Sequence, residues 1–316
     1  MGLLPVDTRG RLNKMSGYGI GIDLGGTGIK AAAIDLQSGE CLSRVTLPTR
    51  DGERDGEVPG FVSAARDIVG MLTDEVGSVA SLTGVSAPGL AMQDGLAIAY
   101  MPGRLDGLEG LNWAEALNCE QPIRVLNDAH AALLGELWQG ACRGARDAVM
   151  LTLGTGVGGA ILAGGQLLKG AIGRAGHIGH ISVDFEGSPD ICGTPGSLED
   201  AIGNATLESR CGGAFADTHE LVSAYAAGDE LAERVWMRSL RALAAAVVSL
   251  ANTVDPQSIV IGGGIAEAGE HLFNPLKDLV SEREWQPAGA RVEIVPAALG
   301  SWAGAYGAVY NSLMAG

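Results

Sequence analysis

Two stretches of the chain share one pattern, in which an apolar run, a glycine-rich tip and a second apolar run follow one another. The first is YGIGIDLGGTGIKAAAID, with apolar runs over residues 19–24 and 29–35. The second starts at Asp147 and reads DAVMLTLGTGVGGAILAGGQLL. Short apolar runs joined through glycines predict β-hairpins. Because the layout occurs once in each half of the chain, it predicts an internally duplicated fold.

Downstream of each hairpin, the spacing of apolar residues alternates between that of helices and that of strands. In the first half a helix is predicted over 58–76, then a strand in VASLTGVSAPG and a strand running into a helix in PIRVLNDAHAALLGELW. In the second half a long helix is predicted over 229–253, followed by strand, turn and helix in DPQSIVIGGGIAEAGEHLFNPLKDLV. This alternation predicts an α/β fold with a parallel or mixed sheet covered on both faces.

Composition narrows the class of protein. With 316 residues, 47% of them hydrophobic, the chain is long enough for two lobes. Five widely spaced cysteines form no paired framework, which favours a reducing compartment. The N-terminus does not resemble a signal peptide and no apolar run has the length of a membrane span, so we expect a cytoplasmic protein. A net charge of −16 disfavours binding to nucleic acid or to anionic membranes.

The glycine-rich tips are candidate phosphate-binding loops. Gly154, Gly156 and Gly159 match G-x-G-x-x-G, but a strand follows them where a dinucleotide site needs a helix. Without Cβ atoms, the backbone N–H groups of such a tip can approach phosphate oxygens closely. The alternative for either tip alone is an ordinary tight turn. Because both tips have the same arrangement and each contains a threonine, together they favour a binding site for a nucleoside triphosphate.

Two aspartates at the ends of predicted strands are candidates for chemistry. Asp23 comes just before Gly-Gly-Thr, where a carboxylate suits Mg²⁺ held partly through water, or caps a turn. Asp128 follows the apolar run 123–126 and begins a helix. Phosphoryl transfer to an alcohol needs a carboxylate that orients the attacking hydroxyl and accepts its proton, which is the role expected of Asp128. The alternative is that Asp128 is a helix N-cap.

Seven motifs in order resemble the ROK family of sugar kinases and repressors, over the chain from about residue 18 to its end. They are DLGGTGIK at 23–30, APG at 87–89, LNDAHAA at 126–132, LGTGVGG at 153–159, GHISV at 179–183, CGTPGSLE at 192–199 and IVIGGGI at 259–265. The resemblance implies an actin-like, hexokinase-type fold with two lobes around a central cleft that holds ATP and a sugar. It divides the chain into a disordered extension (1–16), a small lobe (17–126) joined by a C-terminal helix (302–316), and a large lobe (127–301).

The same resemblance implies roles for individual residues. Asp128 would be the general base toward the 6-hydroxyl of a hexose or hexose derivative, and the first loop would lie next to Asp23, the residue expected above to hold Mg²⁺. The first phosphate loop would use Gly25, Gly26, Thr27 and Lys30, the second Gly154, Thr155 and Gly156, the adenosine site Gly263 and Gly264, and the sugar site Gly89, Asn127, His177, His180 and Glu199.

The chain departs from the family pattern in the zinc motif. The family typically reads Cys-x-Cys-Gly-x-x-Gly-Cys-Leu-Glu, and these cysteines hold a structural zinc together with the histidine of Gly-His. Here Asp190 and Ser197 stand where two of the three cysteines are expected. Closed zinc sites use mostly Cys and His, so we expect the structural zinc to be absent, with weak binding at a remnant of His180, Asp190 and Cys192 as the alternative.

Two further departures concern the sugar. His177 replaces a sugar-binding glutamate, and a neutral imidazole donates one hydrogen bond and accepts one where a carboxylate only accepts. Arg104 follows Pro102 and Gly103 where the family usually has Pro-Asn. Arg104 either faces an acidic or bulky substituent of the substrate or is a surface arginine. The sequence does not identify the sugar.

Two other functions compete with that of a sugar kinase. Repressors of the family carry an N-terminal helix-turn-helix domain, and only about 17 residues precede the first strand here, so with the acidic charge we expect no DNA binding. The second rival is a non-catalytic or degenerate sugar-binding sensor of the same fold. The resemblance also suggests a homodimer.

Overall fold

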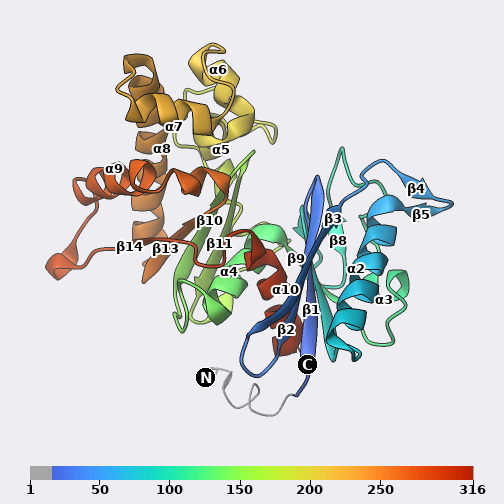
Figure 1. Cartoon of the computed structure of the whole chain (residues 1–316). Coiled ribbons are helices and arrows are strands. Elements are labelled where there is room, and N and C mark those ends of the chain that lie inside the picture. The colour runs from blue at the N-terminus through green and yellow to red at the C-terminus, as the bar shows by residue number, and fades with distance from the viewer. Residues whose placement is uncertain (1–15, 316) are drawn as a thin grey trace. The chain divides into compact units, whose positions relative to one another are not determined.

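The computed structural model describes residues 16–315, which divide into two compact units. Unit 1 contains the residues up to 144, the short segment 169–175 and the residues from 298 onward, and unit 2 contains 145–168 and 176–297. Each unit is built on a five-stranded mixed sheet with helices packed against it (Figure 1). The predicted α/β class is confirmed.

The sheet of unit 1 has the strand order β3-β2-β1-β6-β9. β1 pairs antiparallel with β2 and parallel with β6, and β6 pairs parallel with β9. The elements of this unit are β1 (Tyr18–Leu24), β2 (Gly28–Asp35), β3 (Cys41–Pro48), β4 (Arg54–Asp55), β5 (Val58–Pro59), α2 (Gly60–Val76), β6 (Leu82–Ala87), β7 (Leu90–Ala91), β8 (Ile98–Tyr100), α3 (Trp113–Ala116), β9 (Arg124–Asn127), α4 (Asp128–Gln139), η5 (Gly300–Trp302) and α10 (Ala303–Ala315).

The sheet of unit 2 has the equivalent order β12-β11-β10-β13-β14. β10 pairs antiparallel with β11 and parallel with β13, which repeats the pairing of β1. The predicted duplication is therefore confirmed. The elements of this unit are β10 (Ala148–Leu153), β11 (Val157–Ala163), β12 (Gln166–Leu167), η1 (Ile178–His180), α5 (Leu198–Ile202), η2 (Asn204–Thr206), α6 (Leu207–Cys211), α7 (Thr218–Ala226), α8 (Glu230–Val254), β13 (Ser258–Gly262), η3 (Gly264–Ala268), α9 (Glu270–Ser281), η4 (Pro287–Gly289) and β14 (Glu293–Pro296).

Glycines on the sheet of unit 1 let the C-terminal helix pack directly against it. In β1 the glycines alternate with Ile20 and Ile22, which are fully buried in one core with α2 (Figure 1). Gly21 points to the other face, where a Cβ would overlap the backbone oxygen of Ala305 in α10. A Cβ at Gly307 of α10 would likewise overlap the backbone oxygen of Ala131 in α4. Close backbone packing therefore joins β1, α4 and α10.

A buried carboxylate fixes the point where the chain returns to unit 1. Glu136 of α4 has no exposed surface, and its oxygens accept hydrogen bonds from the backbone N–H groups of Ala141 (2.6 Å), Ala298 (3.0 Å) and Leu299 (2.8 Å). Charge-assisted hydrogen bonds of this kind are about twice as strong as neutral ones. Glu136 thereby holds the start of the C-terminal segment on α4.

Element boundaries differ from the predicted ones in a few places. The first helix begins at Gly60, because Val58 precedes a proline and is held extended, with Pro59 as its N-cap residue. The long helix of unit 2 begins at Glu230, and the side chain of Asp229 caps it. α4 lies in unit 1, whereas the sequence-based division placed residues from 127 onward in the second lobe.

The prediction of a disordered N-terminal extension falls on residues outside the described part of the chain, apart from Ser16. Among residues 16–315, helices that combine the length and the apolar character needed to cross a bilayer are absent.

Candidate active site

The predicted site residues lie in both units. Unit 1 holds Asp23, Gly25, Gly26, Thr27, Lys30, Gly89, Asn127 and Asp128, and unit 2 holds Gly154, Thr155, Gly156, His177, His180, Glu199, Gly263 and Gly264.

In unit 1, three neighbouring parallel strands end at one edge of the sheet and bring polar side chains together there. Asp23 of β1 is the register partner of Ser86 of β6, and the next residue of β6, Ala87, pairs with Asn127 of β9. Ligands in open α/β sheets bind at the carboxyl ends of the strands. The structure therefore brings the two predicted aspartates to one edge, because Asp128 follows Asn127 directly.

Asn127 is the N-cap of α4, and Asp128 is not. The Oδ1 atom of Asn127 accepts hydrogen bonds from the N–H groups of Ala129 (3.0 Å) and His130 (3.2 Å), while its Nδ2 donates to the backbone oxygen of Gly89 at 3.0 Å. Asp128 is the first residue of the helix and is exposed, with Oδ1 accepting from the N–H of Ala129 at 2.8 Å. A carboxylate in the first turn of a helix interacts favourably with the helix dipole, and Asp128 stands at that position.

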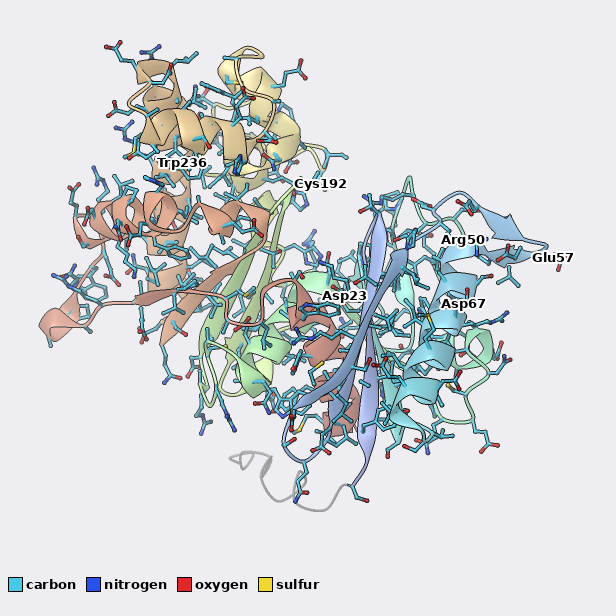
Figure 2. The ribbon with its side chains drawn as sticks, viewed as in Figure 1. Asp23, Arg50, Glu57, Asp67, Cys192 and Trp236 are labelled. Atoms are coloured by element: carbon cyan, nitrogen blue, oxygen red, sulfur yellow. The ribbon has the colours of Figure 1, made fainter. Side chains whose placement is uncertain are left out.

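Asp23, labelled in Figure 2, has a raised pKa. Its pKa is raised from 3.8 to about 6, mainly by burial and also by the carboxylate of Asp128, and these outweigh the lowering effects of Ser86 and Lys30. The Oγ atom of Ser86 donates to Asp23 Oδ1 at 2.7 Å. A Cβ at Gly304 would contact the carboxyl group of Asp23, which places that group beside the N-terminus of α10. A half-buried carboxylate of this kind fits a divalent cation, which would offset the cost of its charge.

The first glycine loop joins β1 to β2. The N–H of Gly25 donates to the backbone oxygen of Gly28 at 3.0 Å. Thr49 holds the loop from outside, since its Oγ1 donates to the oxygen of Gly25 at 2.6 Å and its N–H donates to the oxygen of Thr27 at 3.1 Å. The carbonyl oxygens of Gly25 and Thr27 therefore both accept hydrogen bonds from Thr49. Carbonyls held in this way are compatible with a loop whose N–H groups bind an anion.

The second glycine loop, in unit 2, has similar support. The oxygens of Gly154 and Thr155 accept from the N–H groups of residues 204 and 205, each at 2.9 Å. Glu199 Oε2 accepts from the N–H of Val157 at 2.8 Å, and a Cβ at Gly156 would overlap that oxygen. The structure therefore brings the predicted sugar residue Glu199 directly against a residue of the predicted phosphate loop.

A pocket of about 380 Å³ in unit 2 adjoins the predicted adenosine residues. Gly263 has a left-handed backbone (φ 85°) and lies on the end of β10, where a Cβ would overlap the backbone oxygen of Leu153. The walls of the pocket are Asn204, Asp217, Thr218, His219, Val222, Ser223, Ala226, Gly264, Ile265, Glu267, Ala268 and His271. Sequence reasoning found Gly264 but missed the wall from α7, because helical spacing in this segment shows only a packed helix. The volume is in the range of small-ligand sites.

The ROK family profile matches residues 19–313. The chain belongs to the ROK family. A glucokinase of Halalkalibacterium halodurans is 32% identical over 91% of this chain and 92% of its own length. An N-acetylmannosamine kinase of Escherichia fergusonii is 31% identical over 92% of this chain and 96% of its own. The predicted family is confirmed, and both of these relatives are sugar kinases, the predicted enzyme class.

A solved structure extends this likeness to the fold. The ROK family glucokinase of Streptomyces griseus in complex with glucose and AMPPNP matches with a TM-score of 0.77 and 26% identity, over 94% of this chain and all of the other. The actin-like fold predicted for this ROK protein is confirmed.

The residues that replace the family's zinc ligands form a hydrogen-bonded group in this ROK protein. Ligand atoms of His180, Asp190 and Cys192 all lie within 4.8 Å of one another. Asp190 Oδ2 lies 2.8 Å from Nδ1 of His180, while Cys192 Sγ lies 3.6 Å from Nε2, on the other side of the ring (Figure 2 labels Cys192). Burial alone would raise the pKa of Asp190, but hydrogen bonds from His180, the backbone and Ser197 lower it.

We expect this group not to retain zinc. Ser197 caps α5 through a hydrogen bond from the N–H of Asp200 at 3.2 Å, which leaves three donors where closed zinc sites use four. The ligand atoms of His180, Asp190 and Cys192 do lie within 4.8 Å of one another, so weak binding by this remnant is the alternative. Metal analysis after dialysis should give clearly less than one zinc per chain. Stoichiometric zinc that survives dialysis, and is lost in His180→Ala, would contradict this expectation.

Proposed function

We propose that this ROK protein is an ATP-dependent kinase that phosphorylates a hydroxyl group, expected to be the 6-hydroxyl, of a hexose or hexose derivative. The observation that carries the proposal is the exposed carboxylate of Asp128 at the start of α4. Asn127 is the N-cap of this helix, and Asp128 lies at the same edge of the sheet as Asp23. The glucokinases and N-acetylmannosamine kinases among its relatives support the same reaction.

In the proposed reaction, the carboxylate of Asp128 accepts the proton of the attacking sugar hydroxyl. The hydroxyl oxygen forms a bond to the terminal phosphorus of ATP while the bond from that phosphorus to the bridging oxygen breaks, and ADP leaves. Orientation and electrostatic stabilisation carry most of the catalysis in such transfers. The role of Asn127 is to fix the start of α4, through its bonds to Ala129, His130 and Gly89.

Mg²⁺, when bound, would neutralise charge on the phosphates. Asp23 is the residue that would face it, partly through water, and Ser86 holds the Asp23 carboxylate in place. The adenosine is proposed to bind the pocket beside Gly264, and the phosphates to follow the second glycine loop. Glu199, His180 of η1 and His177, the residue just before η1, are proposed to bind sugar hydroxyls.

The test of this proposal is a coupled assay for ADP release across a panel of glucose, mannose, N-acetylmannosamine and N-acetylglucosamine. We expect sugar-dependent turnover with at least one of them, and the position of the phosphate on the product identifies the hydroxyl. Tight binding of AMPPNP and sugar without turnover on any member would instead favour the non-catalytic sensor.

The raised pKa of Asp23 predicts an acid limb in the pH dependence of catalysis. Asp23 is protonated in the free enzyme below about pH 6 and cannot then offer a charged ligand to Mg²⁺. We therefore expect kcat/KM to rise as the pH increases through about 6. The folded protein also binds this proton more tightly than the unfolded chain, so the contribution of Asp23 to the free energy of unfolding is present below about pH 4 and lost as the pH rises through about 6.

Ser86→Ala provides the control for this assignment. The Ser86 hydroxyl lowers the pKa of Asp23, so its removal should move the acid limb of kcat/KM to higher pH. An acid limb at the same pH in wild type and Ser86→Ala would show that another group produces it.

A further inference from the structure

Arg104 lies directly on the first glycine loop of unit 1. A Cβ built on Gly26 would overlap Nη2 of Arg104, and its other near neighbours are the remaining guanidinium atoms. The guanidinium therefore packs against the backbone of Gly26 at the tip between β1 and β2. Only a residue without a side chain permits this approach. Arg104 is exposed, but its guanidinium has a defined contact with the glycine loop.

The two residues that follow Arg104 are held by contacts with the segment 51–54. Leu105 is buried, has a left-handed backbone (φ 55°) and donates its N–H to Asp51 Oδ1 at 2.9 Å. The next residue, Asp106, pairs with Arg54 at 3.3 Å. A left-handed backbone is costly for a residue such as leucine and persists where the surroundings enforce it. These contacts fix the backbone next to Arg104.

Arg104 differs from the arginines near it in its partners. Arg50 (labelled in Figure 2) pairs with Glu53 and Asp55, and Arg54 pairs with Asp106. Within residues 16–315, Arg104 makes neither an ion pair nor a hydrogen bond, although the chain carries a net charge of −16. A guanidinium keeps its charge and offers five N–H donors in a planar fork that matches phosphate oxygens. Arg104 is thus available to an anion at the glycine loop.

We propose that Arg104 binds the terminal phosphoryl group of ATP and stabilises it during transfer to the sugar. The inference rests on the proposed kinase function. The charge on a phosphoryl group in transfer spreads over its equatorial oxygens, and a forked guanidinium can donate to two of them. Arg104 lies on the first glycine loop, which the family resemblance assigns to phosphate, and this position favours a phosphoryl group over an acidic substituent of the sugar.

Two variants and a matched control test the proposal with the whole chain. Arg104→Ala should lower kcat by on the order of 10²-fold with little change in the KM of the sugar, because the contact is made to the transferring group. Arg104→Lys should recover part of the loss, and guanidinium ions added to Arg104→Ala should recover part of it as well. Arg143→Ala removes another exposed arginine of unit 1, beyond the C-terminal end of α4, and should change kcat less than about twofold.

A binding measurement separates failure of this proposal from failure of the kinase assignment. Arg104→Ala should lose affinity for AMPPNP and keep that for ADP, which lacks the terminal phosphate. Equal effects on both nucleotides, or a kcat within twofold of wild type, would overturn the role of Arg104. An increase confined to the KM of the sugar would assign Arg104 to the sugar and overturn it too. If the wild type shows no turnover but Arg104→Ala still loses affinity for AMPPNP and not for ADP, the kinase function alone is refuted.

Discussion

Replacement of Asp128 by asparagine is expected to lower kcat by about 10²-fold or more, the usual contribution of a general base. The amide keeps the size of the side chain and a hydrogen bond to the sugar, but it cannot accept the proton. Because Asn127 caps α4, the helix start should survive the substitution. Sugar affinity should therefore change much less than turnover, which steady-state kinetics and direct sugar binding would show together.

Asp94→Asn is the matched control, because Asp94 is an exposed carboxylate of the same unit whose Oδ1 accepts a hydrogen bond only from the nearby N–H of Leu96. Its turnover should equal that of the wild type. If Asp128→Asn retained more than about a tenth of wild-type kcat while folded and binding sugar, Asp128 would not be the base.

Replacement of Glu136 by alanine is expected to lower the free energy of unfolding by about 3 kcal/mol or more. The substitution leaves the three N–H groups of Ala141, Ala298 and Leu299 without their acceptor in a buried place, and each unsatisfied group costs roughly 1–3 kcal/mol. It also releases the start of the segment that leads into α10. Urea denaturation followed by circular dichroism measures the effect.

Glu136→Gln should lower the free energy of unfolding by less than Glu136→Ala does. One oxygen acceptor remains, although the amide nitrogen cannot accept from the N–H groups that faced the other oxygen. Glu115→Ala is a suitable comparison, since Glu115 is exposed in the short helix α3 and its side chain accepts a hydrogen bond from Asn112. A loss below about 1 kcal/mol in Glu136→Ala would show that the carboxylate does not hold the C-terminal segment.

Much of the fold could be predicted because its elements depend on local patterns. Glycine tips between apolar runs fix the two hairpins, and helical spacing fixes α8 to within one residue at each end. The boundary between the units was harder to place. α4 follows directly on β9, but whether it belongs to the first or second unit depends on its packing against α10, about 170 residues further along the chain.

In the candidate site, too, some residues could be predicted from local patterns and others could not. Asp23 and Asp128 could be selected from sequence because both end an apolar strand, and the resemblance to the ROK family supplied the remaining residues. The wall of the unit 2 pocket from α7 could not be selected, since Thr218 and Val222 follow an ordinary helical pattern. The roles of the individual site residues stay predictions that the variants above test.

The sequence by itself determined the duplicated hairpins, the family and the residue types available for phosphoryl transfer, because each depends on neighbours within a few positions of the chain. Only the tertiary structure decided that Asn127 rather than Asp128 caps α4, that Ser86 bonds to Asp23, and that Arg104 lies on Gly26. The bond of Asn127 to Gly89, the bond of Ser86 to Asp23 and the contact of Arg104 with Gly26 each join residues 38 or more positions apart. They depend on strand register and on the space above a glycine, which no local pattern encodes.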